Sequence, residues 1–434
     1  MDTAYRARTT RERQGAVPAF AGPVVRRSAG LCKGVVCGTI RHMRIGIDAS
    51  RAARAEQTGT EAYSCHLIRA LIESRRHNEI ILYSPTAPSE SLWAAGASGA
   101  NERCPVRIIP FPRLWTHVRL NWELRRHAPD LLFVPAHVMP VRCPTPAVVT
   151  VHDLGYLYYP DAHRRFDRWY LDWTTRRHTR SAACIIADSE ATRADLIRHY
   201  GAEPNRIRVI FPGRDETLQR VEDPVAVERS KARCGIRGPY MLYLGTLQPR
   251  KNLVRLVDAF ARVPSWPGYP SAPAVRRSAC FCRGTEPPLQ LVLAGKKGWL
   301  YENLFHHVAA LGLQNRVLFP GYVAPEDKAA LLSGACALVF PTLYEGFGMP
   351  VVEAMTCGVP VLTSNISSLP EVAGDAALLV DPLNVDDIAD GMVRLLSDRE
   401  LRRSLAQKGY ARARQFSWQR AAAQLWEVFD SLVR

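Results

Sequence analysis

Short runs of apolar residues alternate with longer amphipathic segments from residue 43 onward. The first run is RIGID, residues 44–48, and it passes directly into a loop. Such runs are apolar throughout instead of alternating with polar residues, which is typical of strands in a parallel sheet with helices on both faces. The pattern therefore predicts an α/β fold.

Further runs of the same kind fill two halves of the chain. The first half continues with IILYSP (80–85), RIIPFP (107–112), LLFVPAH (131–137), AVVTVHDL (147–154), CIIADS (184–189) and RIRVIFPG (206–213). The second half holds YMLYLGT (240–246), LQLVLAG (289–295), RVLFPGYV (316–323), ALVFPT (337–342), VPVLTSN (359–365) and AALLVDP (376–382). We therefore expect two Rossmann-like domains, at residues 43–213 and 214–416.

Three segments lie outside this alternation. Residues 1–42 carry eight basic residues against two acidic ones and show no apolar periodicity, so we expect a disordered basic extension, with Met43 as an alternative start. Residues 263–288 are rich in proline, small residues and arginine, which predicts an insertion loop. Residues 417–434 have apolar residues at helical spacing and predict a helix that packs on the domains.

The composition is that of a globular protein. Of the 434 residues, 47% are hydrophobic and 23% charged, and no apolar run approaches the roughly 18 residues of a membrane-spanning helix. The 11 cysteines are scattered, which favours reduced thiols in the cytoplasm. Cys280 and Cys282 are a close pair without a second pair at zinc-ligand spacing, so we predict no metal site.

Positive charge is in excess, because lysine and arginine outnumber aspartate and glutamate by 57 − 41 = 16. Such an excess favours nucleic acid, an anionic membrane surface or phosphorylated small molecules as partners; an arginine-rich composition also arises from a GC-rich genome. Residues 164–180, RRFDRWYLDWTTRRHTR, place aromatic residues at helical spacing among arginines. This stripe fits an interfacial membrane helix and a core helix with a basic outer side equally well.

The most specific chemistry lies in residues 344–362, YEGFGMPVVEAMTCGVPVL. Gly346 and Gly348 let the backbone approach a ligand closely, at the strand end where parallel sheets bind ligands. Glu345 and Glu353 flank this turn, and each can accept hydrogen bonds from the vicinal hydroxyls of a ribose or a hexose. A helix-dipole role would explain Glu353 alone. A nucleoside diphosphate sugar would use both carboxylates.

A second motif, YLGTLQPRKNL (243–253), places two adjacent cations after a strand. Arg250 offers bidentate hydrogen bonds and Lys251 a point charge, so the pair suits a diphosphate. Taken alone, such a pair is usually solvated surface. Asn252 is the expected cap of the helix that follows.

These motifs resemble the family-four retaining glycosyltransferases of the GT-B fold. Three further segments carry the same resemblance: GVPVLTSNISSLPEVAGDAALLVDP, LAGKKGWLYE and ADSEATRADL. The likeness covers most of residues 43–434 except the insertion. It implies two Rossmann-like domains facing each other across a donor and acceptor cleft. It also implies sugar transfer from a nucleotide donor with retention at the anomeric carbon, without an obligatory metal or other cofactor.

The sequences of the motifs LGTLQPRKNL and GKKGWLYE are most similar to those of mannosyltransferases of surface polysaccharide assembly. This similarity implies GDP-mannose as the donor, with a UDP-sugar as the alternative. The implied acceptor is a saccharide or a lipid-linked saccharide, handled by a cytoplasmic enzyme that is either free or peripheral on the inner face of the membrane.

The resemblance further implies roles for individual residues. It places Glu345 near the donor hexose and Glu353 at the donor ribose, with Arg250 and Lys251 at the diphosphate. Backbone contacts to the donor are implied for Gly346, Phe347 and Gly348. Together with His152 of the first domain, the residues expected to act in catalysis are Arg250, Lys251 and Glu345.

In the first domain, Thr58, Gly59 and Thr60 resemble a glycine loop near the donor phosphates or the acceptor. His152, in VHDLGYLYYP, matches a position where related enzymes carry a histidine near the reacting sugar; for an isolated histidine, a satisfied strand end is the alternative. The interdomain segment departs from the family, because Pro212 precedes the glycine where an asparagine is common.

Other functions stay open at this point. A basic nucleic-acid-binding protein would explain the charge but not the paired glutamates, and we expect no nucleic-acid partner. A GT-B epimerase or phosphorylase would differ in its need for an acceptor. A donor-binding regulatory homologue without turnover is a further alternative.

Overall fold

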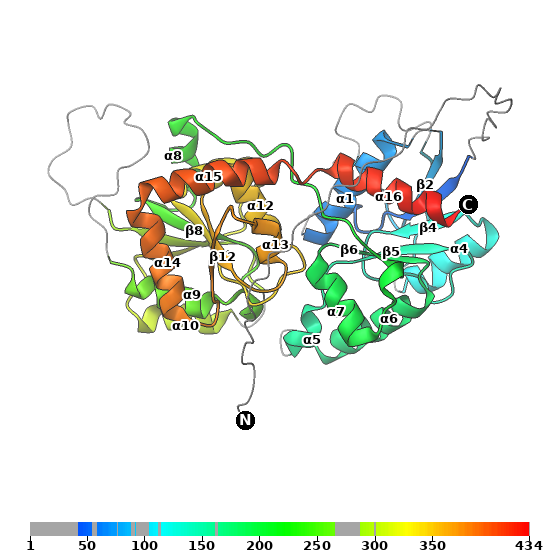
Figure 1. Cartoon of the computed structure of the whole chain (residues 1–434), viewed down its shortest axis with the longest axis horizontal. Coiled ribbons are helices and arrows are strands. Elements are labelled where there is room, and N and C mark those ends of the chain that lie inside the picture. The colour runs from blue at the N-terminus through cyan, green and yellow to red at the C-terminus, as the bar shows by residue number, and fades with distance from the viewer. Residues whose placement is uncertain are drawn as a thin grey trace, which may run out of the picture. The chain divides into compact units, whose positions relative to one another are not determined.

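The computed structural model describes residues 42–53, 59–75, 77–87, 92, 104–111, 114–160, 164–264, 287–298 and 301–433. The basic extension expected over residues 1–42 and the insertion expected over 263–288 lie almost entirely outside these ranges, as does Thr58. The described part of the chain contains two separate parallel sheets with helices around each (Figure 1).

Seven described strands form the first sheet, in the order β3-β2-β1-β4-β5-β6-β7, with every pairing parallel. They are β1 (Arg44–Asp48), β2 (Glu79–Ser84), β3 (Val106–Ile108), β4 (Leu131–Val134), β5 (Ala147–Val151), β6 (Cys184–Ala187) and β7 (Ile207–Val209). The strands β4, β5 and β6 are buried along their whole length because helices cover both faces, as the apolar runs predicted.

The connections of the first sheet are mostly helical. They are α1 (Gly59–Glu73), the π-helical turn η1 (Thr116–Leu120), α4 (Asn121–Arg126), α5 (Gly155–Tyr158), α6 (Arg165–Ser181), α7 (Glu190–Tyr200) and the 3-10 turn η3 (Pro204–Arg206).

Six described strands form the second sheet, in the order β10-β9-β8-β11-β12-β13, again all parallel. They are β8 (Tyr240–Leu244), β9 (Gln290–Ala294), β10 (Val317–Gly321), β11 (Ala337–Phe340), β12 (Val361–Ser364) and β13 (Leu378–Val380). The helices on this side of the chain are α8 (Pro224–Arg233), the 3-10 turn η4 (Pro249–Lys251), α9 (Leu253–Arg262), α10 (Glu302–Ala310), α11 (Pro325–Ser333), α12 (Met349–Thr356), α13 (Leu369–Ala373), α14 (Val385–Ser397) and α15 (Arg399–Ala413).

The last helix, α16 (Trp418–Leu432), packs into the core of the first sheet although it follows the second sheet in sequence. Its Phe429 is fully buried and lies 5.6 Å from the ring of Phe133 in β4. Trp426 donates a hydrogen bond to the hydroxyl of Ser74 at the end of α1. The chain therefore crosses between the sheets twice, once after β7 and once before α16.

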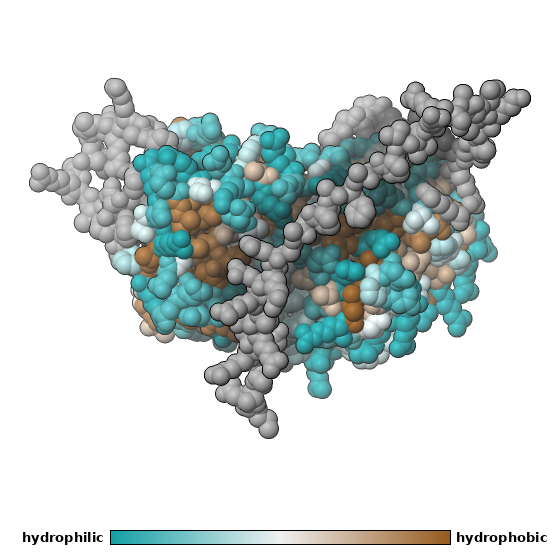
Figure 2. Space-filling model, in the orientation of Figure 1, coloured by the Kyte–Doolittle hydropathy of each residue, from teal (hydrophilic) through white to brown (hydrophobic). Residues whose placement is uncertain are grey.

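Hydrophilic residues cover most of the face shown in Figure 2, and hydrophobic residues gather in smaller areas among them. Within the described ranges, no helix combines the length and the apolar character needed to cross a membrane.

Gly213 lies where the chain leaves the first sheet, against the start of α16. A methyl group added at this glycine would meet the backbone nitrogen of Trp418 at 2.3 Å. We predict that Gly213→Ala lowers the free energy of unfolding by about 1–3 kcal/mol because a backbone atom cannot move aside cheaply. Denaturant unfolding would measure this. Gly59→Ala is the control, since nothing lies within 4 Å of that position; equal stability of the Gly213 variant would contradict the packing.

Candidate functional site

The loops that follow β8 and β11 meet at one edge of the second sheet. These strands are neighbours, and the chain proceeds outward from β8 to β9 and β10, but from β11 to β12 and β13 on the other side. Ligands of parallel sheets bind in the crevice at such a reversal of strand order. The loop after β8 carries Arg250 and Lys251 in η4, and the loop after β11 carries Glu345.

Asn252 ties these loops together. Its side-chain amide donates to the carbonyl of Pro341 at 2.9 Å and to that of Pro382 at 2.6 Å, which follow β11 and β13. Its backbone has a left-handed φ of 63°, and its side chain does not cap α9. Asn252 is the N-cap residue of α9, as predicted, but its side chain makes no capping bond because the amide binds the carbonyls at neighbouring strand ends.

Lys251 and Glu345 form a buried ion pair. Each side chain is only 10% exposed, and the ammonium contacts Glu345 Oε1 directly. Burial lowers the pKa of Lys251 and outweighs the opposing effect of Glu345. A buried charge of this kind needs its partner. The two residues predicted at the donor diphosphate and hexose are thus in contact.

Arg250 links the two sheets. Its guanidinium lies 3.4 Å from Asp153 Oδ2, in the loop after β5, and donates to the carbonyl of Tyr344 at 2.9 Å. Burial raises the pKa of Asp153, but Arg250, the Gly155 backbone N–H, His137 and Lys251 together lower it more, so the carboxylate stays ionised. Burial likewise opposes the charge of Arg250, yet Asp153 and Glu345 raise its pKa overall.

The glycine-rich turn packs against the loop after β5. A methyl group at Gly346 would lie 1.9 Å from the carbonyl oxygen of His152, so only glycine fits here. Gly348 precedes α12 with a φ of 103°, a conformation that favours glycine. The close approach of the His152 carbonyl therefore requires glycine at position 346, and the backbone conformation favours glycine at position 348.

Glu353 lies in α12, as predicted, and contacts the ammonium group of Lys328 in α11. The side chain of Glu353 is 10% exposed and that of Lys328 25% exposed. The carboxylate thus has a cationic partner that holds it in one orientation, which helix-dipole stabilisation would not require.

His152 is held on both sides of its ring. Its Nδ1 lies 2.7 Å from Asp188 Oδ2, and its Nε2 lies 3.1 Å from the carbonyl oxygen of Pro135. A carbonyl only accepts, so Nε2 is the donor in that bond. Burial lowers the pKa of His152, but Asp188 raises it more. The ring therefore favours its charged form and has no free nitrogen to act as a base.

The sheet register explains why His152 meets Asp188. Val151 of β5 pairs with Ala187 of β6, so the residues that follow them leave the sheet side by side. Burial raises the pKa of Asp188 despite the opposing effect of His152. Because the pKa values of both His152 and Asp188 are raised, the pair retains a proton between the two side chains.

Gly59 is the first residue of α1 and is exposed. The helix that Gly59 begins contacts His152 through Tyr63, whose ring packs edge-on against the His152 ring with centroids 4.6 Å apart. Thr60 follows in the first turn, where its carbonyl accepts a hydrogen bond from Ser64. Tyr63 thus connects α1 to His152, whereas Gly59 and Thr60 lie one helical turn before that contact.

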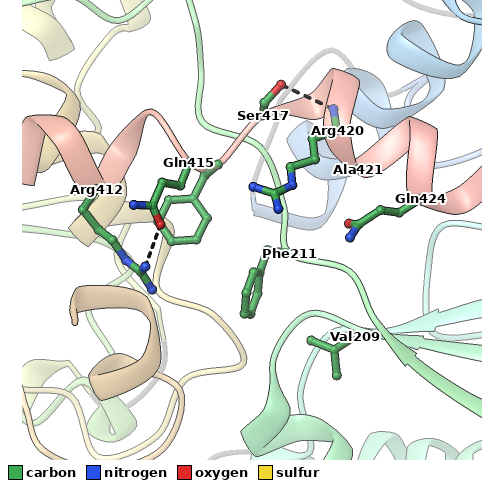
Figure 3. Close-up of a pocket in the computed structure, with 9 residues that line it drawn as sticks. Val209, Phe211, Arg412, Gln415, Ser417, Arg420, Ala421 and Gln424 are labelled. Carbon is green, nitrogen blue, oxygen red and sulfur yellow. Dashed lines mark hydrogen bonds between the residues drawn. The ribbon is translucent and has the colours of Figure 1, made fainter. Parts of the chain in front are cut away.

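A cavity of about 220 Å³ lies between the end of β7 and the junction of α15 with α16 (Figure 3). Among the described residues that line it, none was predicted as part of the site. Phe211 and Phe416 border the cavity, and the ring of Phe347 lies 6.0 Å and 5.3 Å from theirs. The side chain of Phe347 therefore points toward this junction. Only its backbone forms part of the glycine-rich turn.

In the part of the chain that the structure describes, no three His, Cys, Asp or Glu side chains are grouped as they are in a metal site. Cys280 and Cys282 fall outside that part.

Comparison with known proteins identifies the family. Residues 58–218 match Glycosyltransferase Family 4, and residues 228–412 match Glycosyl transferases group 1. O-antigen chain mannosyltransferase B of Escherichia coli is 30% identical over 406 residues, covering 89% of this chain and 99% of that protein. This chain belongs to the group 1 glycosyltransferases. The family resemblance inferred from the sequence motifs is confirmed.

A further relative and two solved structures are similar to this chain. The glycosyltransferase is 31% identical over 272 residues to MMP alpha-(1->4)-mannosyltransferase of Mycolicibacterium hassiacum, covering 61% of this chain and 58% of that one. HepE of Anabaena, solved in complex with UDP and glucose, has a TM-score of 0.66 at 21% identity, covering 90% of this chain and 100% of that one. Sucrose-phosphate synthase of Thermosynechococcus elongatus has a TM-score of 0.68 at 22% identity, covering 90% and 99%. The GT-B fold predicted from the sequence is confirmed.

Three partners of the predicted residues had no role assigned from sequence: Asp153, Asp188 and Lys328. The sequence contains a feature that could have identified two of them, because Asp153 and Asp188 follow adjacent strands of the first sheet and lie within the quoted motifs VHDL and ADSE. No such feature of the sequence identifies Lys328, because its contact with Glu353 depends on where α11 lies relative to α12.

Two further histidines of this glycosyltransferase lie beside each other and are neutral, and one of them, His137, is near His152. His137, after β4, lies 2.6 Å from Thr175 Oγ1, and burial together with the nearby His152 lowers the pKa of His137 to about 4. His178 Nε2 accepts a hydrogen bond from the Met139 backbone, and burial lowers the pKa of His178 well below its usual range.

Stability is expected to fall as the pH drops from about 6.5 toward 4. The unfolded chain binds protons in this window that native His137 does not, so this histidine alone removes about 2 kcal/mol between pH 7 and pH 5. Denaturant unfolding at both pH values would measure the loss. His137→Gln should lessen the difference, whereas His77→Gln, at an exposed position, should not. An unchanged difference in His137→Gln would refute the neutral state.

Proposed function

We propose that this glycosyltransferase moves a mannosyl residue from GDP-mannose to a saccharide or lipid-linked saccharide, with retention at the anomeric carbon. The observation that carries the proposal is the meeting of Arg250, Lys251 and Glu345 at the edge where the second sheet reverses its strand order. The O-antigen mannosyltransferase relative supports mannose as the transferred sugar.

The two cations are the proposed diphosphate site. A diphosphate would join the carboxylates as a further partner of Arg250 and Lys251, and the start of α12 adds a positive helix dipole nearby. Negative charge grows on the diphosphate as its bond to the sugar breaks. Cations that are already held in place by Asp153 and Glu345 stabilise that charge without reorganisation.

The two glutamates are the proposed hydroxyl-binding groups. Glu345 would accept hydrogen bonds from the hexose, and Glu353, oriented by Lys328, from the vicinal hydroxyls of the ribose. In the transfer step, the bond between the anomeric carbon and the phosphate oxygen breaks while the acceptor oxygen bonds to the same face. The acceptor proton passes to the departing phosphate oxygen, so no protein nucleophile is needed.

His152 then serves as a positioning residue. Its ring is fixed by Asp188 and Pro135, and its carbonyl lies against the Gly346 position, so it sets the distance between the loop after β5 and the glycine-rich turn. Gly346, Phe347 and Gly348 would offer backbone groups to the donor. Gly59, at the start of α1, would offer a backbone N–H to the phosphates or the acceptor.

We further propose that the reaction needs no metal ion, because the fixed cations supply the charge that a divalent ion would otherwise bring. The enzyme would act in the cytoplasm, peripheral to the inner face of the membrane, where a lipid-linked acceptor is present.

Glu353→Gln should weaken GDP binding about 10- to 100-fold, because a neutral amide is a poorer acceptor for the ribose hydroxyls. Isothermal titration with GDP, UDP and ADP would measure this and name the nucleotide. Glu326→Gln is the matched control, since Glu326 is an exposed residue of the neighbouring α11. Binding of GDP by the Glu353 variant at the parental affinity would exclude the ribose role.

Arg250→Ala should lower the transfer rate constant by about 10²- to 10³-fold through loss of a charge that stabilises the leaving diphosphate. Rates of mannose transfer from GDP-mannose to an acceptor oligosaccharide, with and without a chelator, would measure it. Arg262→Ala removes an exposed arginine of α9 and should leave the rate unchanged. A rate within a few-fold of the parent for Arg250→Ala, or loss of the parental activity in chelator that magnesium restores, would contradict the mechanism.

A further inference from the structure

The aromatic residues of α6 lie on its solvent side. Phe166 is 70% exposed, Trp169 59% and Trp173 37%. The side of α6 that packs inward is polar instead, and its buried residues are Thr174, Thr175, His178 and Thr179. Amphipathic helices of globular proteins place their apolar stripe toward the core. This helix has the reverse arrangement, so its aromatic side calls for a partner.

The inward side of α6 is fixed by hydrogen bonds. Thr175 Oγ1 lies 2.6 Å from His137 Nε2 and 2.7 Å from the Tyr156 hydroxyl, and His178 accepts from the Met139 backbone. These bonds give partners to Thr175 Oγ1 and to His178 Nε2 and hold the helix in this rotation. The outward aromatic side is therefore a consequence of specific contacts within the domain.

The exposed rings are ordered against one another. Phe166 stacks on Tyr170 with an interplanar angle of 8°, and Trp169 stacks on Trp173 with an angle of 14°. The Tyr170 hydroxyl lies 2.6 Å from His117 Nε2, which belongs to η1. The aromatic stripe of α6 thus adjoins a second surface element.

That second element, η1 with α4 and the residues just before η1, also exposes apolar residues four positions apart. Leu114 is 65% exposed, Val118 48% and Trp122 45%. The guanidinium carbons of Arg119 and Arg126 lie 4.6 Å and 4.2 Å from the centre of the Trp122 ring. We name the combined surface the basic aromatic face, formed by Leu114, Val118, Trp122, Phe166, Trp169 and Trp173.

Arginines surround this face. Those that are exposed in the two elements and just before α6 are Arg125, Arg126, Arg164, Arg165, Arg168, Arg176 and Arg180. Among the acidic groups, Glu123 is buried and paired with Arg107 and Arg119, and Asp172 is paired with Arg176, whereas Asp167 is exposed. The balance of charge is positive, which complements an anionic surface.

We propose that the basic aromatic face docks on an anionic lipid bilayer. Tryptophan and phenylalanine would enter the headgroup region while the arginines contact lipid phosphates. The exposed Leu114 and Val118 favour a bilayer over nucleic acid, since aliphatic side chains gain more from lipid than from stacking on bases. This inference rests on the proposed function and deepens it, because docking would bring the acceptor-side domain to a lipid-linked saccharide.

Vesicle co-sedimentation without donor or acceptor tests the docking alone. The full chain is mixed with phosphatidylcholine vesicles that contain or lack phosphatidylglycerol, at low and high salt. We expect binding to the anionic vesicles, weakened by salt. The double variant Phe166→Glu/Trp169→Glu should bind at least about tenfold more weakly. Tyr410→Glu, at a 53% exposed aromatic residue of α15, is the matched control and should bind like the parent.

Titration with GDP and light scattering on the same proteins separate the outcomes. Retained GDP affinity in the double variant would show that its loss of vesicle binding is not a folding failure. Absence of parental binding to anionic vesicles, or equal binding by the double variant, would overturn the docking and leave the proposed transfer intact. A parental dimer that dissociates in the double variant would assign the face to a second copy instead. Binding to anionic vesicles without binding of GDP would contradict the proposed function and leave the docking proposal unaffected.

Discussion

The buried guanidinium of Arg250 is the group on which the geometry of the site depends. Most of its side chain is removed from water, so its charge is stable only with partners. One partner, Asp153, belongs to the first sheet, and the other, the Tyr344 carbonyl, precedes the glycine-rich turn of the second. A single cation therefore couples the loop after β5 to the loop after β11.

The close approach of backbone to backbone follows from the same coupling. With the two loops joined, the His152 carbonyl occupies the space where any side chain larger than that of Gly346 would begin. His152 in turn cannot shift, because Asp188 and Pro135 hold both of its ring nitrogens. Charge pairing in the centre thus sets the packing around it, and the glycine is a consequence of that packing.

Much of the fold could be predicted because local physics determines it. Apolar strands imply covered parallel sheets, and Gly348 marks a backbone conformation that favours glycine, whereas the need for glycine at 346 comes from the distant His152 carbonyl. Contacts between distant segments could not be predicted. The pairing of Glu353 with Lys328 requires α11 to lie beside α12, and the real role of Asn252 requires knowing which carbonyls face it. Neither is encoded in the spacing of nearby residues.

The helix α6 shows where reasoning from periodicity fails for a physical reason. An aromatic stripe at helical spacing indicates which residues share a side, but not which side faces the core. Here the hydrogen bonds of Thr175 and His178 hold the polar side of the helix inward, because buried polar groups need partners. The stability of the domain is thus compatible with an outward aromatic surface, and the free energy of covering Phe166 and Trp169 remains for a partner to gain.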